Sequence, residues 1–153
     1  MERRVERWMT HDVLSLLPTS RLADALELME RERIRHVLVV DAHERLAGIV
    51  SDRDVKRLLL ERRPLTHALD RPLAQVMTKR VIRLDPGATL SEAAEVMCRE
   101  KISALPVCDG DRILGIITSE DLLWAYAELD RGEEELREDE EIDRSVPPDR
   151  DAA

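Results

Sequence analysis

The chain repeats itself, and this duplication limits the folds open to it more than any other feature. The stretch GIVSDRD at residues 48–54 returns as GIITSED at residues 115–121, and Met9-Thr10 returns as Met77-Thr78. A unit of about 60 residues buries too little surface to be very stable alone, so we expect the two copies to share one core. Other matches keep the same register: Val13 with Val81, Pro18 with Pro86, Leu22 with Leu90, Ala25 with Ala93, Met29 with Met97 and Ile34 with Ile102.

Each copy predicts the element order β-α-β-β-α. Short apolar strands at 13–16 and 81–84 are followed by turn signals at Pro18 and at Asp85–Gly87. The residues after each turn carry apolar side chains at helical spacing. Two further strands, HVLVV and LAGIV or LPVC and ILGII, are joined by a short polar turn typical of a hairpin. A last helix begins at SDRD or TSED, and the chain is therefore predicted to be an α/β (α+β) protein.

Composition argues against several classes of protein. With no Phe, one Tyr, two Trp and a net charge of −9, the chain lacks the stacking side chains and basic groove that single-stranded nucleic acid requires. The first ten residues lack the apolar core of a signal peptide, and no apolar run reaches the roughly 18–20 residues of a membrane span. We therefore expect a cytoplasmic protein without a membrane partner. Cys98 and Cys108 are too few for a metal site or disulfide framework and are predicted to be small buried residues.

The doubled stretch admits two interpretations. Ser51 with Asp54, and Thr118 with Asp121, have the spacing of a helix capping box. The same groups suit a nucleoside phosphate, because a hydroxyl can donate to a phosphate, a carboxylate can accept from ribose hydroxyls, and a helix N-terminus attracts anions. Gly48 and Gly115, the first residues of the two stretches, lie inside predicted strands, where glycine allows another group to approach the backbone closely. Both interpretations stay open at this point.

Together these features resemble a pair of CBS (cystathionine β-synthase) domains. The resemblance rests on the tandem units, the Met-Thr starts, the proline turns, ALPVCD at 104–109 and both G-h-h-[S/T]-x-x-D stretches, and it covers residues 5–129. It implies two repeats packed by their sheets into one pseudo-twofold Bateman module with two clefts, similar to stand-alone CBS-pair proteins, and a disc-shaped homodimer of such modules. The expected organisation is a first repeat at 5–62, a linker at 63–72, a second repeat at 73–129 and an acidic, disordered tail at 130–153, helical at most to about residue 141.

The resemblance also implies the ligand and its contacts. Clefts of the family bind adenosine-containing ligands such as AMP, ADP, ATP or S-adenosylmethionine, here as a regulatory ligand. The family's ribose-binding aspartates correspond to Asp54 and Asp121, and the backbone that meets adenine corresponds to 35–38 and 103–106. The first cleft is accordingly expected to contain Ser15, Arg35, His36, Val37, Leu38, Ser51, Arg53 and Asp54, and the second Arg83, Ser103, Ala104, Leu105, Pro106, Thr118 and Asp121.

Charge and shape differ between the two clefts. Residues 51–63 carry five basic side chains, whereas residues 118–130 carry none, and Glu120 stands in place of Arg53. A phosphate beside Arg53 gains a charge-assisted contact, so we predict that the first cleft prefers phosphorylated adenosines and the second a less charged adenosyl ligand or none. The basic cluster can also be a solvated helix face, and basic groups of one unit can reach the cleft of the other. Pro106, at the family's usual proline position, has a leucine as its counterpart, and proline removes a backbone donor.

The predicted function is a regulatory module that senses an adenosyl ligand and alters its packing or its affinity for a target protein. A ligand can do this only by binding one arrangement better than another. The alternative is a ligand-independent interaction scaffold in which the doubled stretch only caps helices. We do not expect an enzyme, because the sequence has no nucleophile–base pair, P-loop or HExxH motif. His36, a lone histidine at a strand start, is more often structural than a ligand contact.

Overall fold

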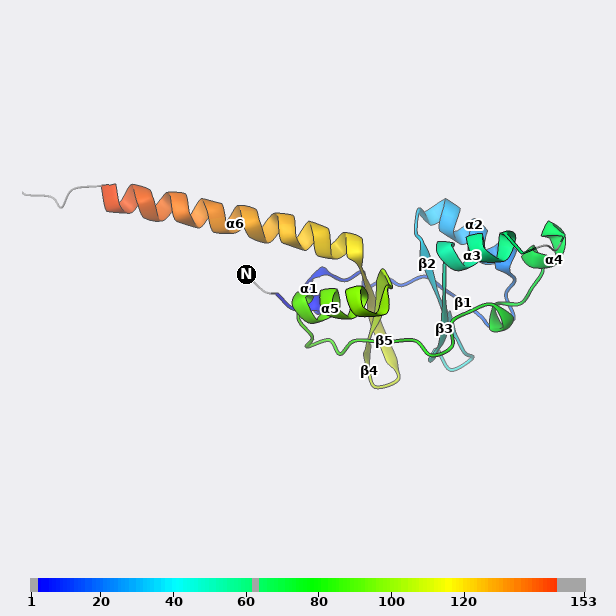
Figure 1. Cartoon of the computed structure of the whole chain (residues 1–153). Coiled ribbons are helices and arrows are strands. Elements are labelled where there is room, and N and C mark those ends of the chain that lie inside the picture. The colour runs from blue at the N-terminus through cyan, green and yellow to red at the C-terminus, as the bar shows by residue number, and fades with distance from the viewer. Residues whose placement is uncertain (1–2, 62–63, 146–153) are drawn as a thin grey trace, which may run out of the picture.

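The computed structural model describes residues 3–61 and 64–145 and places two α/β units side by side (Figure 1). In the first unit β1 (Ser15–Leu16) pairs parallel with β2 (His36–Val40), and β2 pairs antiparallel with β3 (Leu46–Ser51). Helices α2 (Leu22–Glu32) and α3 (Asp52–Leu59) complete this unit. The predicted order β-α-β-β-α is confirmed here, and β2 and β3 form the expected hairpin.

The second unit repeats this plan with its first strand shortened. The strand predicted at 81–84 is reduced to one parallel bridge between Leu84 and Val107. Extending that ladder by one residue requires a backbone N–H from Pro106, which proline lacks. Its counterpart Leu38 does have an N–H and pairs with the first strand of its own sheet. The remaining elements are α5 (Leu90–Glu100), β4 (Ala104–Asp109), β5 (Arg112–Thr118) and α6 (Ser119–Ser145).

Each unit is completed by a segment that precedes the other unit in the chain. Helix α1 (Val5–Trp8) packs into the second unit, where the Val5 N–H donates to the Ala88 carbonyl at 2.9 Å. Conversely, η1 (Leu73–Gln75) packs on the first unit, where the Leu73 N–H donates to the Ser20 carbonyl at 2.8 Å. The packed units therefore differ from the sequence repeats at 5–62 and 73–129, and α4 (Leu65–Leu69) lies within the predicted linker.

This exchange explains why glycine and Met-Thr are both duplicated. Thr10 exchanges two backbone hydrogen bonds with Ile116, of 2.9 and 3.0 Å. A Cβ on Gly115 would lie 2.7 Å from the Thr10 carbonyl oxygen and 2.6 Å from a methionine sulfur. Thr78 and Gly48 have the same arrangement in the first unit, where the carbonyl oxygen would be 3.0 Å away. Because glycine has no Cβ, both positions allow the backbone of the crossing segment to lie close to the strand. The close approach expected at these glycines is therefore made by another part of the same chain.

The core has one apolar cluster in each unit and a third between the units. Leu38, Ala104 and Ile116 form the third cluster, so the two copies share an apolar interface as their size predicts. No polar or charged residue is buried in the described part of the chain. Cys108 is buried as expected, but Cys98 is exposed, because it lies on the solvent-facing side of α5.

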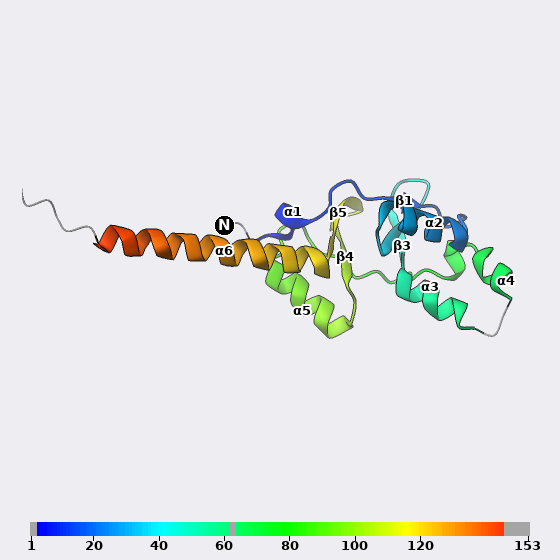
Figure 2. The same ribbon diagram turned by 90° about the horizontal axis from the view of Figure 1, so that it is seen from above.

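Helix α6 projects well beyond both units (Figures 1 and 2). Its 27 residues correspond to about 40 Å. The tail is helical through residue 145, beyond the limit of about residue 141 expected from the sequence, because this acidic stretch is rich in Glu and Arg, which are strong helix formers. Residues 146–153 of the predicted disordered tail lie outside the described part of the chain. Arg3 pairs with Glu133 at 2.6 Å, which ties α6 to the amino-terminal segment. Within residues 3–61 and 64–145, no helix is both long and apolar enough to cross a membrane.

Candidate functional site

The aspartates of the doubled stretch cap the helices that they begin. The Ser51 N–H and hydroxyl donate to Asp54 Oδ2 at 2.9 and 2.8 Å, and the Asp54 N–H donates to Ser51 Oγ at 3.2 Å. Thr118 and Asp121 form the same box, with distances of 2.7, 2.8 and 3.3 Å. The capping interpretation of the sequence is therefore confirmed for both copies.

Capping engages only one oxygen of each carboxylate. Oδ1 of Asp54 has a single long contact, 3.5 Å from the Arg57 guanidinium, and Oδ1 of Asp121 has no hydrogen-bond partner among the described residues. An ionised carboxylate has about four acceptor positions. Each aspartate can thus cap its helix and still accept hydrogen bonds from a bound molecule.

A cavity of about 500 Å³ opens beside Asp54. We call it the Asp54 cavity, and its walls come from both units. The first unit contributes the end of β3 and the start of α3, including Ser51 and Arg53. Opposite them lie Ile82 on the approach to the second unit and Ser103 just before β4. Arg53 spans the two sides, because its Nη1 donates to the Lys101 carbonyl oxygen at 3.2 Å.

The Asp121 cavity, of about 300 Å³, is its pseudo-twofold counterpart. It contains the start of α6 with Thr118 and Asp121, and it is closed by residues 10–14 and 32–36 of the first half of the chain. Every residue that lines it has a repeat counterpart in the Asp54 cavity. Examples are Thr10 with Thr78, Asp12 with Arg80, Leu14 with Ile82, Arg33 with Lys101 and Glu120 with Arg53.

The two cavities have opposite charge. The Asp54 cavity is lined by five basic and three acidic side chains: Arg35, Arg53, Lys56, Arg80 and Lys101 against Asp52, Asp54 and Glu100. In the Asp121 cavity the balance is reversed, with two basic and four acidic side chains: Arg33 and Arg35 against Asp12, Glu32, Glu120 and Asp121. Both differ in volume as well as in charge, so they are suited to different molecules.

Arg35 and His36 lie in the wall between the cavities and line both of them. His36 Nε2 is 3.2 Å from the Ser103 hydroxyl oxygen, which links the two units at this point. Burial lowers the pKa of His36 below its ordinary value, although the nearby Asp52 carboxylate opposes this shift. The Arg35 guanidinium lies 3.9 Å from the Glu120 carboxylate, on the Asp121 side of the wall.

A family model decides the evolutionary assignment of this doubled architecture. The CBS domain model matches the chain twice, at residues 5–61 and 73–128. The chain belongs to the CBS domain family. Its tandem CBS repeats account for the pseudo-twofold relation of the two cavities, and the resemblance noted in the sequence is confirmed.

Several proteins with CBS repeats are similar to this chain. A crystal structure of a Vibrio cholerae protein described as the acetoin utilization protein AcuB has a TM-score of 0.76 and 39% identity, covering 88% of this chain and 98% of that one. CBSX2, solved in complex with AMP, has a TM-score of 0.74 and 25% identity, covering 84% and 99% of the two chains. Inosine-5′-monophosphate dehydrogenase of Nitrosopumilus maritimus is 34% identical over 115 residues, 74% of this chain. The chain spans only 22% of the length of that enzyme.

The structure regroups the residues that the CBS resemblance assigns to two clefts. Ser51, Arg53 and Asp54 lie together as predicted, and so do Thr118 and Asp121. Ser103 and Ala104, assigned to the second cleft, line the Asp54 cavity instead. The segments that precede each repeat cross between the units, so each cavity combines the helix start of one CBS repeat with the strand start of the other.

Other residues assigned to the clefts lie away from both cavities. Ser15 and Arg83 follow Leu14 and Ile82, which are the last residues of their segments to line the cavities. The remaining ones lie deeper along their strands and are fully buried or nearly so, because only the first residues of β2 and β4 reach the cavities: Val37, Leu38, Leu105 and Pro106. Sequence reasoning missed Thr78, Arg80, Lys101 and their counterparts, whose signal was their equivalent position in the two repeats.

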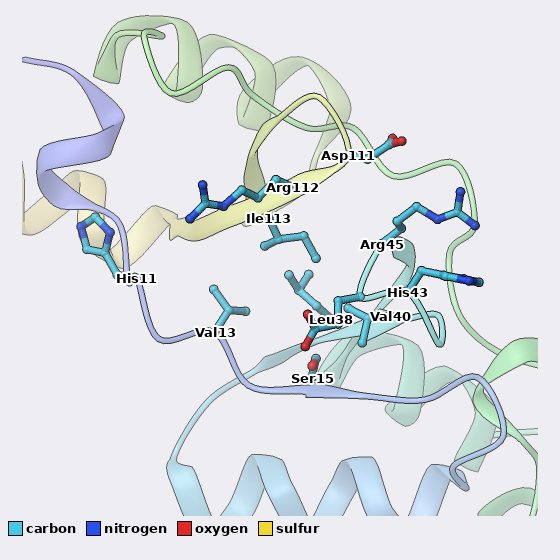
Figure 3. Close-up of a pocket in the computed structure, with 11 residues that line it drawn as sticks. His11, Val13, Ser15, Leu38, Val40, His43, Arg45, Asp111, Arg112 and Ile113 are labelled. Carbon is cyan, nitrogen blue, oxygen red and sulfur yellow. The ribbon is translucent and has the colours of Figure 1, made fainter.

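A third cavity lies at the opposite end of the strands, between the two hairpin turns (Figure 3). It measures about 580 Å³, and Val13, Ser15 and Leu38 lie at its centre. Arg45 and Arg112 are repeat counterparts at its rim, and their guanidinium groups point in different directions away from that centre. No group of three His, Cys, Asp or Glu side chains able to hold a metal ion occurs in the described part of the chain.

Proposed function

We propose that this CBS pair is a regulatory module that binds adenosine-containing ligands in the Asp54 and Asp121 cavities. The observation that carries the proposal is that the cap leaves Oδ1 of each aspartate unused beside an open cavity, with only the long Arg57 contact at Asp54. Capping alone would not require such a space. CBSX2, which shares this fold, was solved in complex with AMP, and this supports an adenosyl ligand here.

In the proposed complex, the ribose hydroxyls donate to the free oxygen of each aspartate. The adenine ring packs against the apolar wall, which in the Asp54 cavity consists of Ile49, Val81, Ile82 and Ile102. Phosphate groups lie toward Arg53 and Arg80, where charge-assisted hydrogen bonds are available. In this arrangement the cavity binds the nucleotide and holds it in place, which is the chemistry of a regulatory module.

The charges of the cavities favour different adenosyl ligands. The basic Asp54 cavity suits AMP, ADP or ATP, because their phosphates are attracted by the excess of arginine and lysine. The acidic Asp121 cavity suits an uncharged or cationic ligand, for which S-adenosylmethionine with its sulfonium is the appropriate chemistry. This extends the asymmetry predicted from Arg53 and Glu120 to the whole lining of each cavity.

Ligand binding can be separated from helix capping with two matched variants. Asp54→Ala removes the cap and the proposed ribose contact, whereas Glu92→Ala removes the equivalent cap of α5, where the Thr89 N–H donates to Glu92 Oε2 at 2.7 Å, away from both cavities. Each loss lowers the unfolding free energy by about 1 kcal/mol. ATP at about 100 times its Kd stabilises a binder by about 2.7 kcal/mol, which raises Tm by about 5–11 °C. We expect this rise in the wild type and in Glu92→Ala but not in Asp54→Ala; equal rises in all three proteins, or none in any, contradict the proposal.

A second copy of the chain is the proposed first partner. Leu123, Trp124 and Tyr126 on α6 are 71%, 64% and 69% exposed, a set that soluble helices ordinarily cover. Helix α3 carries exposed basic residues, Lys56 and Arg57, at the positions equivalent to Leu123 and Trp124. In the proposed dimer, the second copy covers the exposed apolar side chains of α6. Trp124→Glu should convert a dimer to a monomer in light scattering; an unchanged mass refutes this contact.

The same exposed α6 surface favours the alternative function, a ligand-independent interaction scaffold. In that case the target protein, rather than a second copy, covers Trp124 and its neighbours. The thermal-shift experiment distinguishes the two functions, because a scaffold gains no stability from adenosyl ligands.

A further inference from the structure

The two repeats contribute unequally to the wall between the cavities, although the chain is a duplication. Arg35 and His36 line both cavities, whereas their repeat counterparts, Ser103 and Ala104, line only the Asp54 cavity. The positions also differ in side-chain size, since serine and alanine are short whereas arginine and histidine are long.

Arg35 is attached to the Asp54 side through its backbone and to the Asp121 side through its guanidinium. Its carbonyl oxygen accepts from the Asp52 N–H at 2.9 Å, at the first turn of the helix that Asp54 caps. Its guanidinium is 3.9 Å from Glu120, and the two side chains are 59% and 69% exposed. An exposed ion pair of this length contributes little to stability, so the guanidinium can exchange this partner for another. The His36–Ser103 contact at 3.2 Å holds the adjoining backbone in place.

We propose that Arg35 is a cation shared by the two cavities and that it couples their ligand affinities. This inference rests on the proposed nucleotide function. A cationic ligand in the Asp121 cavity pairs with Glu120 and releases Arg35 toward phosphates in the Asp54 cavity. An anionic ligand in the Asp121 cavity competes with those phosphates for the same guanidinium. By linkage, each ligand changes the affinity of the other by the same factor.

The test uses calorimetric titration of the full chain with ATP, in the absence and presence of saturating S-adenosylmethionine. In the wild type, S-adenosylmethionine should lower the Kd of ATP about fivefold or more, the low end of ordinary coupling between sites. In Arg35→Gln the ratio of the two Kd values should fall to one. The fold tolerates this change, because the backbone carbonyl that binds Asp52 is unaltered and the side chain is exposed.

Arg80→Gln is the matched control, because Arg80 lines only the Asp54 cavity. It should weaken ATP binding and leave the coupling ratio at its wild-type value. A further titration uses AMP and the Asp54→Ala variant, in which the Asp54 cavity has lost its ribose contact. Adding Arg35→Gln to this variant should weaken AMP binding to the Asp121 cavity.

Three outcomes decide between the claims. ATP binding that is insensitive to S-adenosylmethionine in the wild type overturns the inference and leaves the proposed function intact. Coupling of the same size in Arg35→Gln also overturns it, because the shared cation is then not the cause. If neither ATP nor S-adenosylmethionine binds any of the proteins, the proposed function fails and this inference fails with it.

Discussion

Replacing Gly115 by alanine tests the exchange of segments on which both cavities depend. The added Cβ would lie 2.6 Å from Met9 Sδ and 2.7 Å from the Thr10 carbonyl oxygen. The methionine can move, because its side chain is flexible. The carbonyl cannot move without weakening the two hydrogen bonds between Thr10 and Ile116. The substitution therefore forces either the strand or the crossing segment out of position.

The cost can be estimated from these contacts. Insertion of a methyl group into a well-packed site costs about 1–3 kcal/mol, and loss of one backbone hydrogen bond adds about 1 kcal/mol. The expected loss of unfolding free energy is thus about 2–4 kcal/mol. For a chain of 153 residues this lowers Tm by about 4–16 °C. Gly115→Ala should also weaken ligand binding to the Asp121 cavity, because Thr10 and Ile116 line it.

Gly87→Ala is the control within the same unit. Its Cβ would lie 3.3 Å from the Asp85 carboxylate and 3.8 Å from the Arg4 guanidinium, and no backbone atom is within 4 Å, so we expect a change within about 0.5 kcal/mol. Differential scanning calorimetry of the wild type and both variants gives the comparison. If Gly115→Ala melts within about 2 °C of the wild type, the crossing contact does not hold the second unit together and the account of the duplicated glycine is wrong.

Two further predictions follow from His36, which is partly buried, and from Val5, which is fully buried. Burial lowers the pKa of His36 in the folded chain, so the unfolded chain, in which the histidine pKa is about 6.5, binds a proton more readily. The unfolding free energy should therefore fall as the pH drops from about 7 toward the lower folded-state pKa. Urea titrations should show a flatter decline for His36→Gln than for the wild type, and an equal slope would contradict this prediction. Val5 is fully buried in the second unit, so Val5→Ala should lower the unfolding free energy by about 2 kcal/mol. The substitution should accelerate hydrogen exchange in α5 but not in α2. Equal acceleration in both helices would contradict the exchange of segments.

The local elements were predictable because their causes are local. Helical spacing and the hairpin pattern identify α2, α5 and the paired strands, and Thr89-to-Glu92 marks the start of α5, where the capping box forms. The shortened strand at Leu84 also has a local cause, since Pro106 was recognised as lacking a donor. The continuation of α6 beyond about residue 141 was not predicted, because the acidic composition was given more weight than the helix propensity of Glu and Arg.

The make-up of each cavity was not predictable from either repeat alone. The pairing of Thr10 with Ile116 and of Thr78 with Ile49 is non-local, and it decides which strand start faces which helix start. Sequence reasoning placed each aspartate with the strands of its own repeat. Arg35 and His36 do line the Asp54 cavity with which they were grouped, but they also line the Asp121 cavity, and Ser103 and Ala104 line the Asp54 cavity instead of the one assigned to them.

Comparing the two repeats with each other separates what the fold requires from what the cavities select. Positions that form the crossing contact or the cap stay alike: Met9 and Met77, Gly48 and Gly115, Asp54 and Asp121. Three other pairs of cavity positions change charge or size, namely Asp12 and Arg80, Glu120 and Arg53, and Arg35 and Ser103, whereas Val13 and Val81, Glu32 and Glu100, and Ile34 and Ile102 are unchanged. The divergence is the expected result if the two halves of one frame hold two different ligands.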